Sequence, residues 1–221
     1  MNPVTDRAAM FAQLRAGMAE LGLGAEVATV DVLLDYLELL ARWNSAYNLT
    51  SIRAPEQMVT HHLLDSLAVA PFVRGERLAD IGTGAGLPGI PLAVLDPERQ
   101  VTLIDANGKK TRFLREAVRT LKLGNVRIEA CRVEEARGQY DTVTARAFAS
   151  LGDMLDSAGH LLAPNGILLA LKGQLQRDEI TTLPDGFAIA DVHALRVPGL
   201  AAARHAVIIR RTQAVQHGHA A

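Results

Sequence analysis

The sequence predicts an α/β fold in which a mostly parallel sheet follows an N-terminal helical extension. No strand pattern occurs before about residue 77, and from there short apolar runs alternate with segments of helical periodicity. A glycine-rich stretch directly follows the first of these runs. Alternating strands and helices form parallel sheets with helices on both faces. A chain of 221 residues, 49% of them hydrophobic, can bury the core that this architecture needs.

The helical extension is expected to span residues 1–73. Apolar residues recur at helical spacing over 30–44, Pro55 stands where a second helix should begin, and Pro71 ends that second pattern. We expect residues 74–212 to form the domain that contains the sheet. Residues 213–221 are predicted to be a disordered tail, because chain termini are commonly frayed.

Seven strands are predicted within 74–212, the last two as a terminal hairpin. They lie at 77–82, 101–105, 126–130, 140–147, 166–173, 187–195 and 204–211. Helices are expected from the glycine-rich stretch to about residue 95, over 107–123, and over 149–161. The second of these ends at Gly124, a residue type suited to a helix C-cap.

Composition excludes several classes of protein. A formal net charge of −1 argues against a chain that coats nucleic acid by charge alone, although a local basic face is still possible. Cys131 is the single cysteine, so we expect no intrachain disulfide, no cysteine-based zinc site and no other metal site. The start of the chain lacks a signal-peptide pattern, and no apolar run reaches membrane-spanning length. A cytoplasmic protein is therefore expected.

Residues 78–91 read LADIGTGAGLPGIP and form the most informative stretch. Glycine allows unusual backbone angles and close approach of the backbone to a ligand. A strand followed by glycines and a helix is the first βα turn of a nucleotide-binding sheet, whose ligand lies beyond the carboxyl ends of the strands. A tight turn without a ligand is the alternative, and four glycines within eight positions make it the weaker one.

Two nucleotide ligands compete for this loop. Residues 84–89 fit the dinucleotide pattern G-x-G-x-x-G, whereas the stretch from Asp80 reads D-x-G-x-G-x-G. The second reading resembles the first motif of class I methyltransferases, which bind S-adenosylmethionine (SAM). A carboxylate at the strand end attracts the ammonium and sulfonium groups of SAM and would repel a pyrophosphate. Asp105 ends the second strand and is placed to accept hydrogen bonds from a ribose, which both ligands contain.

Several stretches together resemble one family, the RsmG (GidB)-type bacterial methyltransferases of small-subunit ribosomal RNA. They run in order over roughly residues 40–175 and read RWNSAYNLTSIR, HHLLDSLAVAP, DIGTGAGLPGIPLA, LKLGNV, RVEE, ARAFASL and LLALKGQ. The resemblance implies a class I SAM-dependent methyltransferase with a Rossmann-like, mostly parallel seven-stranded sheet and a terminal antiparallel hairpin. It also implies methylation of a guanine N7 in 16S rRNA near the decoding centre, with 16S rRNA or the small subunit as partner. We expect a monomer.

The resemblance also implies the cofactor site. Together with the loop argument, it assigns cofactor binding to Asp80, Gly82, Gly84, Gly86, Leu87, Asp105, Val133, Glu134 and Arg146. The chain departs from the usual family pattern in two places. Ala106-Asn107 stand where members often have Ser-Leu, and Ala85 stands where proline is common.

Chemistry at guanine N7 asks little of side chains. This nitrogen carries a lone pair and no proton, so positioning supplies most of the catalytic effect and no catalytic residue is assigned with certainty. Arg146 is the candidate for shaping the site, by holding cofactor, phosphate or site geometry. A bidentate contact to the substrate guanine would cover N7 itself. The alternative for Arg146 is a structural ion pair with Asp80, Asp105 or Glu134.

RNA binding is predicted for a basic helix face and two separate residues. The face lies within 107–123 and consists of Lys109, Arg112, Arg115, Arg119 and Lys122. An ordinary solvated face is the alternative. Asn48 and Lys172 are further candidates for RNA contact. Trp43 and Tyr47 are spaced to form a stacking platform, although a core position is the preferred interpretation for Trp43.

Three other functions stay open at this stage. The chain could methylate a small molecule or a protein, or it could be an RNA-binding assembly factor that keeps the fold without turnover. A nicotinamide-dependent dehydrogenase ranks last. The neighbouring residues His61, His62, Thr50 and Asp65 could line the mouth of a pocket, and isolated surface or core histidines are the plainer interpretation of His61 and His62.

Overall fold

A seven-stranded sheet forms the centre of the computed structural model, which describes residues 6–146, 150–175, 179 and 182–212. The strands are β1 (Arg77–Ile81), β2 (Gln100–Ile104), β3 (Val126–Glu129), β4 (Tyr140–Arg146), β5 (Leu162–Lys172), β6 (Phe187–Leu195) and β7 (Arg204–Arg211). Their order is β3-β2-β1-β4-β5-β7-β6, with β7 antiparallel to both of its neighbours and the other pairs parallel. The predicted fold class, including the antiparallel hairpin, is confirmed.

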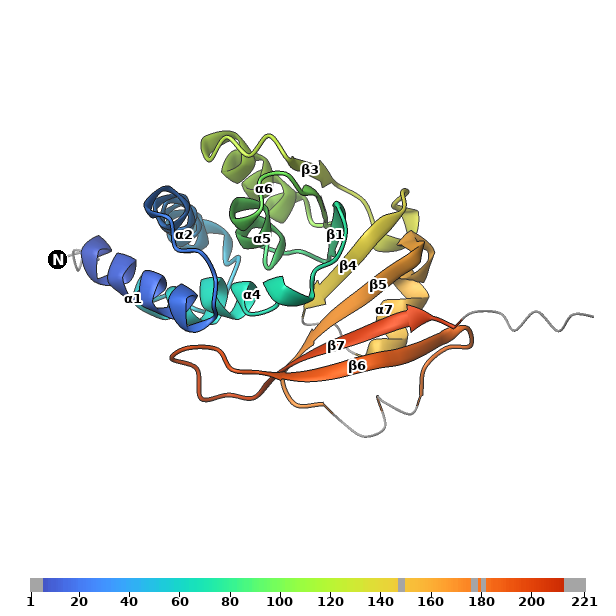
Figure 1. Cartoon of the computed structure of the whole chain (residues 1–221). Coiled ribbons are helices and arrows are strands. Elements are labelled where there is room, and N and C mark those ends of the chain that lie inside the picture. The colour runs from blue at the N-terminus through green and yellow to red at the C-terminus, as the bar shows by residue number, and fades with distance from the viewer. Residues whose placement is uncertain (1–5, 147–149, 176–178, 180–181, 213–221) are drawn as a thin grey trace, which may run out of the picture.

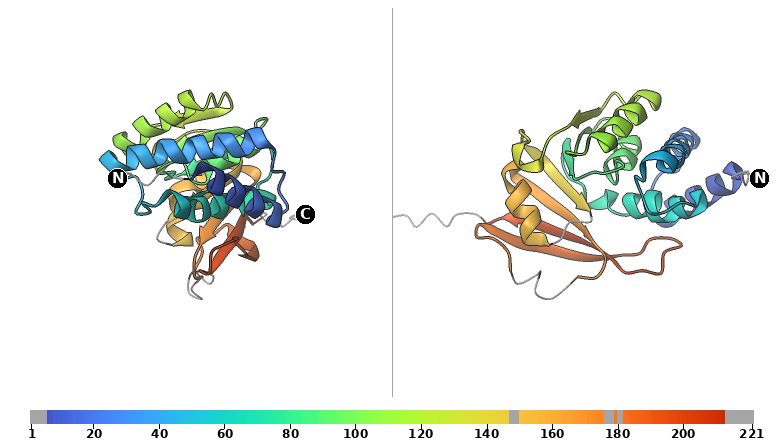
Figure 2. Two further views of the ribbon diagram at one scale, coloured as in Figure 1. Left: turned by 90° about the vertical axis from the view of Figure 1, so that its left-hand side faces the viewer. Right: turned by 180° about the vertical axis from the view of Figure 1, so that it is seen from behind.

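Helices cover both faces of the sheet (Figure 1). One face carries the N-terminal helices α1 (Arg7–Glu20), α2 (Val27–Tyr47), α3 (Pro55–Met58) and α4 (Asp65–Leu67), with α5 (Gly89–Leu95) and α6 (Gly108–Thr120). A π-helix, η1 (Val59–Leu64), joins α3 to α4, and short 3₁₀ turns follow at η2 (Ala70–Phe72), η3 (Val133–Glu135) and η4 (Gly159–Leu161). The other face carries α7 (Leu151–Ala158), as the view from behind shows (Figure 2).

Alternating strand residues divide the core into two clusters, one on each face of the sheet. Leu78 and Leu103 pack with the N-terminal helices, α5 and α6. Ile81 and Ile104 pack with α7 on the other face. Because successive strand residues point to opposite faces, nearly continuous apolar runs are needed to fill both clusters. The N-terminal helices therefore share a core with the sheet, while the division of the chain at residue 73 stays a prediction.

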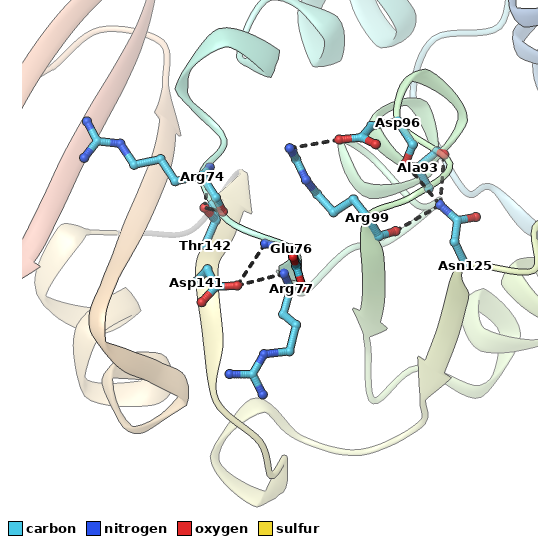
Figure 3. A network of polar contacts seen from close by, with 9 residues as sticks. All are labelled: Arg74, Glu76, Arg77, Ala93, Asp96, Arg99, Asn125, Asp141 and Thr142. Carbon is cyan, nitrogen blue, oxygen red and sulfur yellow. Dashed lines mark hydrogen bonds and ion pairs between the residues drawn. The ribbon is translucent and has the colours of Figure 1, made fainter.

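The amino-terminal edge of the sheet is fastened by side chains that bind backbone groups (Figure 3). The Asn125 side-chain amide donates to the carbonyls of Ala93, Asp96 and Arg99, at 3.0, 3.3 and 3.0 Å. The Asp141 carboxylate accepts from the backbone N–H groups of residues 76 and 77. These contacts fix the turns at the edge opposite the expected ligand site.

The order of the strands creates a switch point between β1 and β4. From this point the chain winds outward in both directions, so the connections after β1 and β4 leave on opposite faces of the sheet. In open α/β sheets a ligand crevice forms beyond the carboxyl ends of the strands at such a point. The glycine-rich stretch follows β1 directly, and Arg146 is the last residue of β4. The topology thus brings these two predicted site elements together.

Some expectations concern segments outside the described part of the chain. The predicted tail, 213–221, lies there, and so do residues 147–149, which include the end of the fourth predicted strand and the centre of the ARAFASL stretch. Within the described ranges, β5 begins four residues earlier than expected, at Leu162. The helices of these ranges include none with the length and hydropathy that a membrane span requires.

Candidate active site

The loop after β1 uses left-handed backbone at three glycines. Gly82, Gly84 and Gly86 have φ values of 57°, 63° and 92°, in the region that side chains with a Cβ disfavour. The loop is closed by hydrogen bonds from the N–H groups of Gly86 and Leu87 to the Thr83 carbonyl, at 2.9 and 3.1 Å. It then runs into α5. The sequence pattern thus marks a real tight turn at the ligand edge.

The glycines of this loop serve two different purposes. A Cβ at Gly84 would make only ordinary van der Waals contacts, at 3.9 Å or more, so this backbone is not tightly packed. A Cβ at Gly86 would lie 2.5 Å from Ile90, and one at Gly89 would lie 2.3 Å from Leu103. The later glycines therefore permit close packing of helix on strand. Gly84 instead leaves a backbone cradle that fits an adenosine-type cofactor, as the loop pattern predicts.

Asp80 lies behind the loop and is fully buried. Its carboxylate accepts hydrogen bonds from the Thr83 hydroxyl, the Gly89 N–H at 2.9 Å and the Thr144 hydroxyl at 3.2 Å. Burial raises the pKa of Asp80 to about 6, although these hydrogen bonds and the charge of Arg146 act in the opposite direction. The carboxylate binds the loop to β1 and β4. Its attraction for the cofactor cation stays a prediction.

Asp105 connects the ends of β1 and β2. One carboxylate oxygen accepts from the Gly84 N–H at 2.9 Å, and the other accepts from the Asn107 N–H at 2.8 Å. Lys110 lies 3.6 Å from the first oxygen, a contact that the sequence analysis did not anticipate. Asp105 is 7% exposed. It therefore stands beside the glycine cradle at the position expected for a ribose-binding acid.

The remaining predicted cofactor contacts differ in exposure. Leu87 is 4% exposed and belongs to the main core cluster, whereas Glu134 is exposed on the 3₁₀ turn η3. Val133, half-buried beside it, packs against the second core cluster, as does the Cys131 thiol. A hydrogen bond from its own backbone N–H, followed by one from Ser157, lowers the pKa of Glu134. Cofactor binding by these residues stays a prediction.

Tyr36 supports the glycine loop from the N-terminal extension. Its buried hydroxyl donates to the Ala85 carbonyl at 2.8 Å, across 49 positions of sequence. Burial raises its pKa. From sequence, Tyr36 could be placed only on the apolar side of a helix, and its contact with Ala85 was not predicted. It explains how the helical extension contributes to the cofactor site.

Replacing Tyr36 with phenylalanine should destabilise the fold by about 1–2 kcal/mol, because the buried Ala85 carbonyl loses its donor. We also expect SAM affinity to fall by roughly threefold as the loop loosens. Urea denaturation and calorimetric SAM titration measure the two effects. Tyr47→Phe is the matched control on the same helix, because no described contact uses the Tyr47 hydroxyl. Equal effects of the two substitutions would contradict the assignment.

Arg146 does not pair with any of the three acids considered from sequence. Its Nη1 atom lies 3.4 Å from the Asp65 carboxylate instead, and Asp65 also accepts from Arg204 Nε at 2.8 Å. Asp65 is 5% exposed, and the two arginine side chains are 25% and 26% exposed. Asp65 was expected at a pocket mouth, whereas Arg204 was not among the predicted site residues. Arg204 begins the last strand, and no local pattern marks it.

These charged groups line a cavity of about 530 Å³ at the carboxyl ends of β4 and β5. Its lining residues are Thr50, Ser51, Ile52, His61, His62, Asp65, Arg146, Leu171, Lys172, Gly173, Gln174 and Arg204. The volume lies within the range of small-molecule sites, roughly 300–1,000 Å³. Segments from the N-terminal extension, the sheet and the terminal hairpin therefore enclose one cavity beside the end of β4.

His62 forms a neutral wall of this cavity. Its Nε2 atom lies 2.9 Å from the Thr50 hydroxyl, and its buried Nδ1 has no hydrogen-bond partner among the described residues. Burial, followed by the charge of Arg146, lowers the pKa of His62 to about 4. His62 is therefore uncharged near neutral pH.

The shifted pKa of His62 predicts a loss of stability in acid. The unfolded chain takes up this proton near pH 6.5, whereas the folded chain resists it down to about pH 4. The contribution is thus present above pH 6.5 and is lost as pH falls toward 4. Between pH 7 and 5, the wild type should lose about 2 kcal/mol more unfolding free energy than His62→Gln. Denaturation at both pH values measures this. The control His61→Gln keeps His62 and should lose as much as the wild type, whereas a loss as small as that of His62→Gln would refute the assignment.

The predicted RNA-binding residues have unequal surroundings. Lys109, Arg112, Arg115 and Lys122 are exposed, and no ion pair within the described ranges involves them. Arg119 instead pairs with Glu116 at 2.8 Å on the same helix. Lys172 lines the cavity and lies 2.7 Å from Glu179.

Trp43, Tyr47 and Asn48 belong to the stretch RWNSAYNLTSIR. Asn48 caps α2 in a left-handed conformation and accepts from Arg53 at 3.3 Å. Trp43 stacks on Tyr47 with ring centroids 5.1 Å apart. It also packs edge-on against Phe113 of α6, at 5.7 Å. Trp43 is therefore half-buried against the main core cluster, as the preferred interpretation expects, and it is also stacked on Tyr47. RNA contact by Asn48 stays a prediction.

This fold and this glycine loop, with acids at the ends of β1 and β2, define a class I SAM-dependent methyltransferase. The family model GidB, described as rRNA small subunit methyltransferase G, matches residues 29–208. The chain belongs to this family. This match extends beyond residues 40–175, the range of the stretches that resemble the family. It confirms the predicted family and cofactor class.

Individual proteins agree with this assignment. The chain is 53% identical over 204 residues to ribosomal RNA small subunit methyltransferase G of Stenotrophomonas maltophilia (strain K279a), covering 91% of this chain and 95% of the relative. It is 51% identical over 202 residues to the protein of that name from Xanthomonas campestris pv. campestris (strain B100), covering 90% and 94%. The crystal structure of M. jannaschii TYW2 in complex with AdoMet shares the fold, with a TM-score of 0.51, 17% identity and coverage of 67% and 75%.

Proposed function

We propose that this chain transfers the methyl group of SAM to N7 of a guanine in 16S rRNA, near the decoding centre. The observation that carries the proposal is the positively charged cavity beside the end of β4, in a chain of the small-subunit rRNA methyltransferase G family. The cavity is large enough for one nucleotide and lies at the same sheet edge as the glycine loop. The proposal includes a monomeric enzyme that acts in the cytoplasm.

The side chains at the cavity suit an acceptor that carries no proton. SAM supplies an electrophilic methyl group on a sulfonium, and N7 supplies a lone pair. Two of the titratable side chains of the described cavity wall are poor bases: His62 because its pKa is lowered, and Asp65 because two arginines hold it. Neither group needs to remove a proton for N7 to be methylated. The residues instead hold the two reactants in line, and such positioning alone can supply a large part of a rate enhancement.

A methyl-transfer assay tests the proposal directly. Labelled SAM is supplied with 16S rRNA that lacks N7 methylation, both free and in small subunits, and the product is mapped by chemical cleavage at 7-methylguanine. Label at a single guanine near the decoding centre is the expected result. Label on another atom, or RNA binding without turnover, would overturn the proposal and favour a different acceptor or a binding role.

The basic face of α6 is the proposed secondary contact with RNA. Arg112→Glu with Arg115→Glu should weaken RNA binding by about tenfold and reduce the steepness of its salt dependence, because two potential phosphate contacts are reversed. Filter binding at several salt concentrations measures both quantities. Arg119→Glu is compared with the single reversals Arg112→Glu and Arg115→Glu and should act more weakly than either, because Glu116 already neutralises Arg119. If RNA affinity is unchanged in the double variant, this face is solvated and does not contact RNA.

A further inference from the structure

Three distant parts of the chain meet at the buried carboxylate of Asp65. Asp65 begins α4 in the N-terminal extension, Arg146 ends β4, and Arg204 begins β7. One carboxylate oxygen lies 2.8 Å from Arg204 Nε, and the other lies 3.4 Å from Arg146 Nη1. All three residues line the same cavity. One acid therefore fixes two guanidinium groups on a single wall.

The charges of this wall leave an excess on the two arginines. Arg146 and Arg204 carry two positive charges, and Asp65 compensates one of them. The other permanent cation of the lining, Lys172, lies 2.7 Å from Glu179 and is compensated there. A single anionic group entering the cavity would thus be attracted to the arginine pair.

The chemistry of the pair favours phosphate as that anion. Guanidinium groups present several N–H donors in a planar fork that matches phosphate oxygens. A bidentate contact between a guanidinium group and the target guanine would instead cover N7, the atom to be methylated. We propose that Arg204 binds the phosphate of the target nucleotide, and that Asp65 is the positioning residue that holds Arg204, with Arg146 beside it, for this contact. This inference rests on the proposed function.

The described contacts explain why Asp65 should matter. Arg146 makes its one described ion pair with Asp65, and Arg204 otherwise donates only to the carbonyl of its neighbour Ala203, at 2.9 Å. Without the carboxylate, two like charges would face each other on different elements, and their side chains would turn apart. The phosphate contact would then lose the preorganised geometry on which its strength depends.

The test compares Asp65→Asn, Arg204→Met and their double variant with the wild-type enzyme. Both single variants should raise KM for unmethylated small subunits by about tenfold, with kcat and SAM affinity nearly unchanged. If Asp65 acts through Arg204, the double variant should lose less than the product of the single losses. Asp65→Glu should recover part of the affinity. Asp96→Asn removes another Asp–Arg pair, at the opposite sheet edge, and should leave KM unchanged.

Multiplicative losses in the double variant, or a loss of SAM affinity in Asp65→Asn with KM unchanged, would overturn the positioning role. Equilibrium binding of a 16S rRNA fragment separates this inference from the proposed function. Arg204→Met should lower the salt slope of RNA binding by about one, whether or not methylation is observed. An unchanged slope would overturn the phosphate contact. Absence of methylation by the wild-type enzyme would instead overturn the proposed function.

Discussion

Replacing Asp80 with alanine should lower SAM affinity by more than about tenfold and destabilise the fold by about 3 kcal/mol. The substitution removes the acceptor for three buried donors, the Thr83 hydroxyl, the Gly89 N–H and the Thr144 hydroxyl. These bonds hold the glycine loop against β1 and β4. The loop should therefore lose the conformation that presents its uncovered backbone. Calorimetric titration with SAM and urea denaturation measure the two effects.

Asp80→Asn separates the loop-holding role from the charge. An amide oxygen can still accept from Thr83 and Gly89, so we expect a smaller loss of SAM affinity than in Asp80→Ala. If Asp80→Asn loses as much SAM affinity as Asp80→Ala, the carboxylate charge itself attracts the cofactor.

The raised pKa of Asp80 predicts that the stability of the wild type and that of Asp80→Asn depend differently on pH. Because its folded pKa of about 6 is above the ordinary value of 3.8, the folded chain binds this proton more tightly. The contribution of this carboxyl to stability should therefore decline as pH rises from about 4 to about 6, and Asp80→Asn should lack that decline. Unfolding free energies at pH 4.5 and 7 for both proteins measure the difference. Parallel pH profiles would contradict the raised pKa.

Arg146→Met should reduce kcat/KM for rRNA methylation by about 100-fold, which corresponds to about 2.7 kcal/mol of transition-state stabilisation. The arginine lies at the carboxyl end of β4 and forms part of the cavity wall, at the same sheet edge as the glycine loop. Its removal takes away one of the two guanidinium groups and leaves Asp65 with Arg204 alone. Single-turnover methylation of small subunits measures the change.

The controls for Arg146 decide which reactant it serves. Arg146→Lys keeps the charge but loses the planar fork, so it should restore only part of the activity. Unchanged SAM affinity in Arg146→Met would place the residue on the acceptor side, whereas weaker binding would confirm the predicted cofactor contact. Full activity of Arg146→Met would refute both roles. Arg99→Met removes an arginine from the opposite sheet edge and should leave methylation unchanged.

Much of the fold could be read from the sequence because its determinants are local. Apolar periodicity distinguishes the N-terminal helices from the strands, and the core clusters show the burial that this periodicity requires. Gly82, Gly84 and Gly86 mark the turn after β1 because left-handed backbone there favours a residue without a Cβ. Asp80 and Asp105 stand at strand ends, and parallel strands place such ends at one edge of the sheet.

The basic helix shows where local reasoning stops. Four of the five predicted cations lie on α6, but the helix ends at Thr120 and not near Gly124, so Lys122 follows it with left-handed backbone. The pairing of Arg119 with Glu116 makes the remaining four unequal. Lys110 was not among them, although it is the lysine that approaches Asp105. Side chains three residues apart on a helix can pair or point into solvent, and the sequence alone does not distinguish these outcomes.

The sequence by itself determined the family, the cofactor class, the layered fold and the position of the glycine loop, because each depends on residues close together in the chain. The tertiary structure alone decided that Tyr36 would reach Ala85, and that Asp65 would bind Arg146 and Arg204 across 81 and 139 positions. A buried charge is stable only when a partner compensates it. Which partner does so depends on segments that become neighbours only when the N-terminal extension, β4 and the terminal hairpin pack together.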